Sequence, residues 1–278
     1  MMNLFLALFR HVYSLRNRID FALRQAIRWS RPGLHLVNED KTSLLRHLPP
    51  ASRSQALQEA SVLRRAYRLE ALYHLSTVDN YLENLFYVQL METALNRVNV
   101  VLPDPLHVVD IGPSSWFYIR GLYQFLKLWN TSKPRRLDVI GYETDPYRVY
   151  SNFYSRYDHA QAYCSGLEGV KYIPSAFKPI VGKWDVALLF FPFVFLPDHL
   201  RWGLPQNTHQ PLKLLEQAWA SVKPGGVLLV VNQGEKEAAE QQKLFNAANI
   251  AIRAAFPFDS ILYQYPLRRF VHVAVRSG

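Results

Sequence analysis

The chain has 278 residues, of which 49% are hydrophobic, so it is long enough to bury a sizeable core and too apolar for wholesale disorder. Its one cysteine, Cys164, excludes an internal disulfide and a cysteine-rich zinc site, and we expect no bound metal. The formal net charge is +10. This charge is densest in the first 31 residues, where six arginines stand against a single acid, Asp20.

No apolar run approaches the roughly 20 residues that cross a bilayer. The short apolar start at residues 4–9 is followed, and not preceded, by arginines, and no small-residue cleavage site appears. A secretory signal is therefore not expected. Together with the single cysteine, this favours a cytoplasmic protein.

Residues 3–29 are predicted to form one basic amphipathic helix. Apolar residues recur there at helical spacing, with the arginines mostly off the stripe: Leu4, Leu8, Val12, Leu15, Ile19, Ala22 and Ala26. Docking on its own domain, a contact with a protein partner and peripheral binding to an anionic membrane surface all fit such a helix. Self-docking is the commonest of the three, and the sequence leaves all of them open.

Two more helices are predicted before the first strand. Ser52 starts a capping box for a helix that runs to about residue 75, and Ser76 with Asp79 opens the next one. We therefore divide the chain into a helical N-terminal extension, residues 1–78, and an α/β domain, residues 79–278.

In that second part strands and helices alternate, which indicates a parallel sheet. One apolar strand ends at Asp110 and Gly112, and another ends about thirty residues later at Glu143. A strand, a small-residue turn, a helix and a second strand that ends in an acid is how a Rossmann-like sheet holds a nucleoside. Ser114 and Trp116 occupy the second and third glycine positions of a dinucleotide-binding turn, so NAD and FAD are disfavoured.

The pattern resembles motif I of the class I S-adenosylmethionine-dependent methyltransferases. Three later segments resemble the same family in the same order: the fourth strand at 183–191, a Leu-Pro-Asp continuation at 194–198, and a helix, Lys-Pro-Gly-Gly turn and fifth strand at 214–231. The resemblance covers about residues 80–278. It implies an α/β fold with a seven-stranded, mostly parallel Rossmann-like sheet and an antiparallel last strand.

The remaining elements are assigned from periodicity. They are helices at 118–129, 147–163 and 235–256, a third strand at 170–173, and a closing hairpin of strands at 260–265 and 269–275. Asp145 is predicted to cap the helix that starts near Pro146.

The resemblance implies S-adenosylmethionine as the cofactor. It assigns Asp110, Gly112 and Ser114 to the first turn, Glu143 to the ribose hydroxyls, Ser175 to the position of the family's adenine-binding acid, and Phe177 and Phe191 to apolar contacts. The plainer alternatives are an ordinary strand-end turn and a solvated strand-end glutamate.

Candidate groups for the acceptor lie in loops after the fourth and fifth strands. Asn232 and Glu235 could orient a polar acceptor, and His199 is a candidate general base, as is His209. An exposed loop histidine without a catalytic role is the plainer reading. Amino-group methyltransferases have an Asn/Asp-Pro-Pro-aromatic element at the end of the fourth strand. Residues 190–193 of this chain, Phe-Phe-Pro-Phe, have phenylalanine in its polar position, which disfavours adenine or glutamine methylation.

These features together predict methyl transfer to a small or medium-sized molecule. Ser114, Trp116 and Ser175 depart from the family pattern and keep open a catalytically weak or inactive binding or assembly protein with the same fold. The basic charge keeps an RNA methyltransferase open, although no RNA-binding motif accompanies it.

Overall fold

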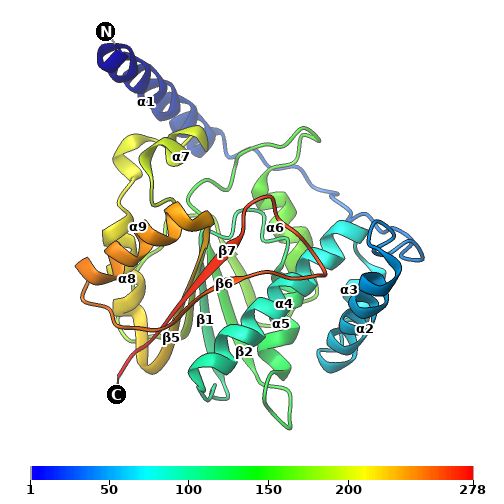
Figure 1. Ribbon diagram of the computed structural model, residues 1–278. Coiled ribbons are helices and arrows are strands. Elements are labelled where there is room, and N and C mark those ends of the chain that lie inside the picture. The colour runs from blue at the N-terminus through cyan, green and yellow to red at the C-terminus, as the bar shows by residue number, and fades with distance from the viewer. Residues whose placement is uncertain (1, 278) are drawn as a thin grey trace.

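The computed structural model describes residues 2–277, with side chains from residue 13 onward. Its centre is a seven-stranded sheet in the order β3-β2-β1-β4-β5-β7-β6 (Figure 1). The strands are β1 Leu106–Ile111, β2 Leu137–Tyr142, β3 Val170–Ile173, β4 Trp184–Phe190, β5 Val222–Gln233, β6 Ile252–Phe258 and β7 Arg269–Val275. Strands β1 to β5 pair in parallel, and β7 is antiparallel to both β5 and β6. The predicted sheet, with its antiparallel last strand, is confirmed.

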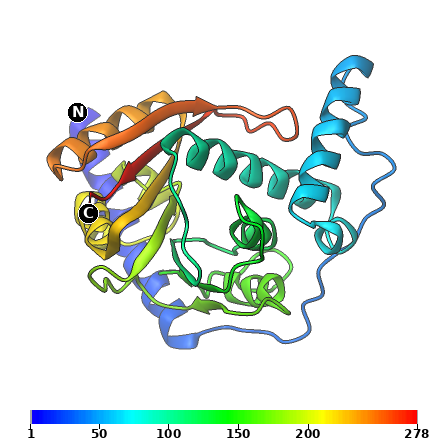
Figure 2. The same ribbon diagram turned by 90° about the horizontal axis from the view of Figure 1, so that it is seen from below.

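Helices cover both faces of the sheet, which is why every residue of β4 is buried. The helices are α1 Met2–Ile27, α2 Pro50–Ala66, α3 Glu70–His74, α4 Val78–Val98, α5 Ile119–Leu128, α6 Arg156–Cys164, α7 Leu196–Arg201, α8 Pro211–Ser221 and α9 Gly234–Ala247, with a 3-10 turn at Gln206–Thr208. Seen along the strands, α4 and α5 lie on one face and α8 and α9 on the other (Figure 2). Within residues 2–277, no helix combines the length and the apolarity that crossing a bilayer requires.

Strand register decides where the strand ends meet. Residues 106–111 of β1 align one for one with residues 137–142 of β2, so the segments after Ile111 and Tyr142 leave the sheet side by side. The order reverses between β1 and β4, which makes this edge the topological switch point where ligands bind in open α/β sheets.

Several helix boundaries differ from the predicted ones. Helix α2 begins at Pro50, without a cap from Ser52, and the hydroxyl that caps α4 belongs to Thr77. The helix expected over residues 147–163 exists only from Arg156 to Cys164, and residues 147–155 form a non-helical loop closed by a bridge between Val149 and Ser155. Its start is set by the Ser155–Asp158 capping box, in which each side chain accepts from the other's backbone N–H.

The predicted first strand of the closing hairpin was wrong. Helix α9 stops at Ala247, and Asn249, with φ 54°, turns the chain into β6. Phe256 and Phe258 are buried while Pro257 is exposed, so the segment alternates with the period of a strand. Its alanines imitate a helix in the sequence, and the residues expected as the strand, 260–265, form a loop.

The helices before β1 share the core of the sheet domain. The Tyr67 ring lies 5.3 Å from that of Phe125 in α5, and the Tyr67 hydroxyl donates to Glu92 of α4 at 2.5 Å. Leu63 and Leu72 belong to the same buried cluster as Val108 of β1. Helix α1 does not share this core. It lies beside α7, at the side of the molecule opposite α2 and α3 (Figure 1).

Candidate functional site

Asp110 lies at the carboxyl end of β1 and is fully buried. Its Oδ2 accepts hydrogen bonds from the indole Nε1 of Trp116 and the hydroxyl of Tyr118, both at 2.8 Å. Its Oδ1 has no partner among the described residues. Burial raises the pKa of Asp110 to about 7, against the opposing effect of the two hydrogen bonds.

Trp116 does not crowd the outside of the turn, contrary to what its place in the sequence implies. The residue has φ 55°, and its side chain is fully buried. A Cβ on Gly141 of β2 would stand 2.9 Å from the indole ring, so the ring packs directly on the bare backbone of that strand. Trp116 is therefore a core residue, and Gly141 is the small residue that makes room for it.

The turn after β1 has open space beside Gly112 and a backbone at positive φ. Gly112 has φ 79°, and a Cβ there would meet nothing within 4 Å. Ser114, also at positive φ, donates its backbone N–H to Oε2 of Glu143 at 2.8 Å, and its carbonyl accepts from the Tyr172 hydroxyl at 2.7 Å. The predicted residues of the first turn therefore meet the predicted ribose acid.

Glu143 ties the loop after β2 to the turn after β1. Its Oε1 accepts from the backbone N–H of Asp145 at 2.7 Å, and the guanidinium of Arg156 lies 3.9 Å away. Burial raises the pKa of Glu143, while Arg156 and the two backbone hydrogen bonds lower it. Both carboxylate oxygens are engaged, and each keeps a second lone-pair direction for a ligand hydroxyl.

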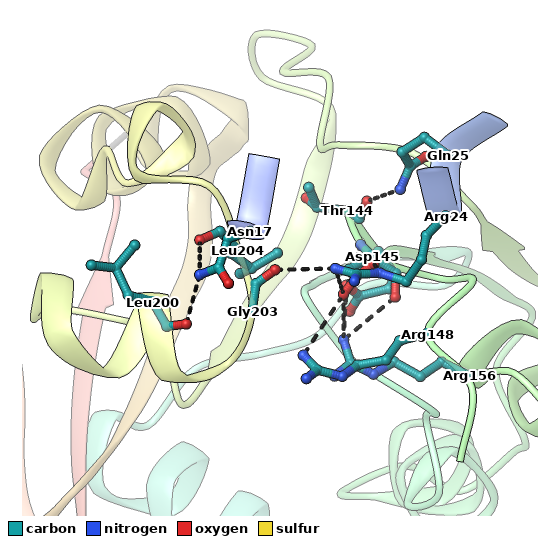
Figure 3. Close-up of polar contacts among 11 residues, drawn as sticks. Asn17, Arg24, Gln25, Thr144, Asp145, Arg148, Arg156, Leu200, Gly203 and Leu204 are labelled. Carbon is teal, nitrogen blue, oxygen red and sulfur yellow. Dashed lines mark hydrogen bonds and ion pairs between the residues drawn. The ribbon is translucent and has the colours of Figure 1, made fainter. Parts of the chain in front are cut away.

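Asp145 does not cap a helix. It is fully buried and makes a two-point ion pair with Arg24 of α1, at 2.8 and 3.1 Å. Arg156 and Arg148 lie 3.8 and 4.0 Å from the same carboxylate. Three arginines therefore surround one acid beside the Glu143 loop (Figure 3).

Helix α1 makes polar contacts with two of the segments that follow the strands at this edge of the sheet. Asn17 donates through Nδ2 to the carbonyls of Leu200 and Leu204, at 2.8 and 3.1 Å, and Gln25 donates to the carbonyl of Thr144 at 3.0 Å (Figure 3). The helix thereby joins the loop after β2 to the loop after β4.

The outer cofactor candidates are only partly buried. The Ser175 hydroxyl contacts the Ala176 carbonyl at 3.4 Å, and the Phe177 ring meets that of Tyr142 edge-on at 5.5 Å. Phe191, at φ 58°, directly follows β4, and the centre of its ring lies 4.5 Å from the guanidinium of Arg269.

No hydrogen bond or ion pair of the described residues joins any two of the three predicted catalytic residues. Asn232 is buried with Nδ2 3.5 Å from Gln241, and Glu235 is exposed in the first turn of α9. His199 is buried, with Nε2 2.9 Å from the carbonyl of Pro205, and burial lowers its pKa. His199 therefore organises the loop after α7, and its geometry does not support a role as general base.

A polar cluster that the sequence analysis missed lies beside Asp110. The Tyr265 hydroxyl donates to Oε1 of Glu83 in α4 at 2.6 Å and lies 3.3 Å from the hydroxyl of Tyr87. The Tyr87 ring stacks at 4.5 Å on Tyr118, the residue that donates to Asp110. Burial raises the pKa of Glu83 to about 7. Since α4 precedes β1 and Tyr265 follows β6, no sequence motif joins these residues.

Aromatic rings and arginines surround this cluster. The guanidinium of Arg269 lies 3.7 Å over the Tyr265 ring. A cavity of about 330 Å³ opens next to it, with a lining that includes Phe86, Phe258, Tyr263, Tyr265, Arg268 and Arg269.

The strand order, with β7 antiparallel between β5 and β6, is that of the Rossmann-like sheet of the class I S-adenosylmethionine-dependent methyltransferases. No protein-family model and no curated protein matches the sequence. Among solved structures, a SAM-dependent methyltransferase from Aquifex aeolicus is 15% identical, with 78% of this chain and 97% of that chain covered and a TM-score of 0.46. One from Leishmania major is 10% identical, covering 89% and 99%, with a TM-score of 0.48. The cyclase SpnF is 12% identical, covering 68% and 81%, with a TM-score of 0.45. These are likenesses of fold, and function rests on the site.

Proposed function

We propose that the protein binds S-adenosylmethionine and transfers its methyl group to a small or medium-sized acceptor. The observation that carries the proposal is Glu143, a buried carboxylate at the end of β2 that is held by the backbone of Ser114 in the turn after β1. This is where a ribose acceptor belongs in a sheet whose order reverses at β1.

The residues at this edge fit the cofactor's chemistry. Asp110 has an oxygen without a partner among the described residues, and the ammonium end of the cofactor would supply the missing donor. Gly112 borders open space, and Glu143 has lone pairs left for two hydroxyls. When bound, the cofactor supplies a methyl group already activated on a sulfonium.

Glu83 is our candidate for the group that removes the acceptor's proton. Tyr265 orients the carboxylate, and a pKa of about 7 suits a general base at neutral pH. We expect methyl transfer to rise as the pH increases through about 7, because the base must be deprotonated, and Glu83→Gln to remove this rise and lower kcat/KM by about 10²-fold. Glu216→Gln, which changes an exposed carboxylate on α8, serves as the control.

A second candidate function is ligand binding without efficient catalysis. It is favoured by the two backbone hydrogen bonds that already use Glu143 to hold the loops together, and by α1, which lies across the site edge through the ion pair of Arg24 with Asp145. Both functions require the same cofactor.

Mass spectrometry of the purified protein and titration calorimetry test the proposal. We expect retained S-adenosylmethionine or its demethylated product, and micromolar or tighter binding on titration. A folded protein that binds neither molecule would overturn both functions. Binding without methyl transfer to any of a broad set of hydroxyl and amine acceptors would leave the second one.

A further inference from the structure

Helix α1 docks on the molecule by its polar side. Asn17, Arg24 and Gln25 make the contacts, and at about 100° per residue they fall within about 100° of one another around the helix. Asn17 is 5% exposed. Self-docking through the apolar stripe, the commonest arrangement for such a sequence, is therefore not what the structure has.

The opposite side of α1 carries an exposed apolar stripe, which we define as Leu15, Ile19, Ala22, Leu23 and Ala26. Leu15, Ile19 and Leu23 are 60%, 53% and 51% exposed. The helix backbone continues to Met2, away from the body of the protein (Figure 1), and Leu4, Leu8 and Val12 continue the stripe in sequence at the same helical spacing. Isolated exposed leucines are ordinary, but a continuous stripe on one helix needs a partner.

Basic side chains border the stripe on both sides. Arg16 and Arg18 are exposed and lie about 80° to either side of the stripe's centre. The one acid within residues 13–27, Asp20, forms a surface pair with Arg16. The rim of the stripe is therefore basic.

Exposed aromatic side chains follow at the end of the helix. The Trp29 indole donates to the carbonyl of Phe153 at 3.0 Å, and the two side chains are 48% and 66% exposed. Aromatic rings with a polar edge gain most at a boundary between apolar and aqueous phases.

We propose that α1 binds an anionic membrane surface. The apolar stripe would enter the boundary between headgroups and acyl chains, and Arg16 and Arg18 would meet lipid phosphates. A second copy of the chain fits this surface less well, because a symmetric contact would bring the arginines of two basic helices together.

Vesicle co-sedimentation of the full chain tests this inference without reference to the cofactor. We expect binding to vesicles of phosphatidylcholine with phosphatidylserine, weaker binding at high salt, and little binding to phosphatidylcholine alone. The double variant Leu15→Gln, Ile19→Gln should lose about tenfold or more in affinity, and so should Arg16→Gln, Arg18→Gln. All of these changes are on exposed side chains, and equal melting temperatures would show that folding is unaffected.

A matched control removes exposed apolar side chains elsewhere. Val101 and Val181 are 85% and 77% exposed, so Val101→Gln, Val181→Gln should bind vesicles like the wild type. The proposal fails if the wild type does not bind anionic vesicles, or if the stripe variant binds as well as the control does. A dimer in light scattering that the stripe variant dissociates would also overturn it, in favour of a second copy as the occupant.

Discussion

At the scale of single residues, Glu143 has two tasks that can be measured separately. It accepts two backbone N–H groups and is the candidate acceptor for the ribose. We predict that Glu143→Ala weakens S-adenosylmethionine binding by about 2–3 kcal/mol, since a charge-assisted acceptor is lost. Titration calorimetry measures this effect, and Glu216→Ala is the control on an exposed carboxylate.

The same variant should lower the free energy of unfolding, because one buried and one partly buried backbone N–H lose their acceptor. We expect about 1–3 kcal/mol in urea titrations. Unchanged cofactor affinity in a folded Glu143→Ala protein would show that this side chain holds the loops together and does not contact the ligand.

The sequence position of Trp116 and its place in the structure lead to opposite expectations for its replacement by glycine. If Trp116 were a bulky residue on the ligand side of a glycine turn, glycine could replace it and would leave more room for the ligand. As a buried ring that packs on Gly141 and donates to Asp110, it should be costly to remove. We predict that Trp116→Gly lowers the free energy of unfolding by about 3–5 kcal/mol, and Trp116→Phe by less. Wild-type stability of the glycine variant in urea would restore the first interpretation.

At the scale of elements, α1 is held on the body by few groups. The Arg24 pair with Asp145 is its only two-point ion pair among the described residues, and Asp145 keeps Arg148 and Arg156 when Arg24 is removed. We therefore predict that Arg24→Gln releases the helix without unfolding the sheet domain. Amide hydrogen exchange should become faster in residues 13–27 and stay unchanged in β1 and β4. Arg16→Gln, on the exposed side, is the matched control, and equal exchange in both variants would contradict the assignment.

At the scale of the whole molecule, one core joins residues on both sides of the boundary drawn at residue 78. Tyr67 packs on Phe125, and the Tyr73 ring meets that of Tyr81 edge-on at 5.1 Å. We predict a single cooperative unfolding transition by circular dichroism and by tryptophan fluorescence. A chain shortened to residues 79–278 should lose it, because Leu85 and Leu95 of α4 share the buried cluster that α2 and α3 help to form. An unchanged melting temperature of that shortened chain would show instead that the N-terminal part is separate.

Local sequence patterns predicted the class of fold and the edge of the sheet at which the cofactor is proposed to bind. A buried strand that ends in Asp110 and Gly112, and a second that ends in Glu143, follow from period and turn chemistry alone, and the strand register then brings them together. The end of α9 could not be predicted, since the alanines around Arg253 favour a helix, and the strand depends on Phe256 and Phe258 packing against α4.

What the sequence by itself determined was periodicity: the order of strands and helices, the amphipathic α1 and the acids at the strand ends. Only the tertiary structure decided which face of α1 is docked, because a polar contact such as Arg24 with Asp145 joins residues 121 positions apart and leaves no periodic signal. The tertiary structure likewise places Glu83 beside Tyr265, 182 positions away, and buries the side chain of Trp116 in the core. Periodicity reports which side chains share a face, and contacts between distant segments arise only when the chain folds.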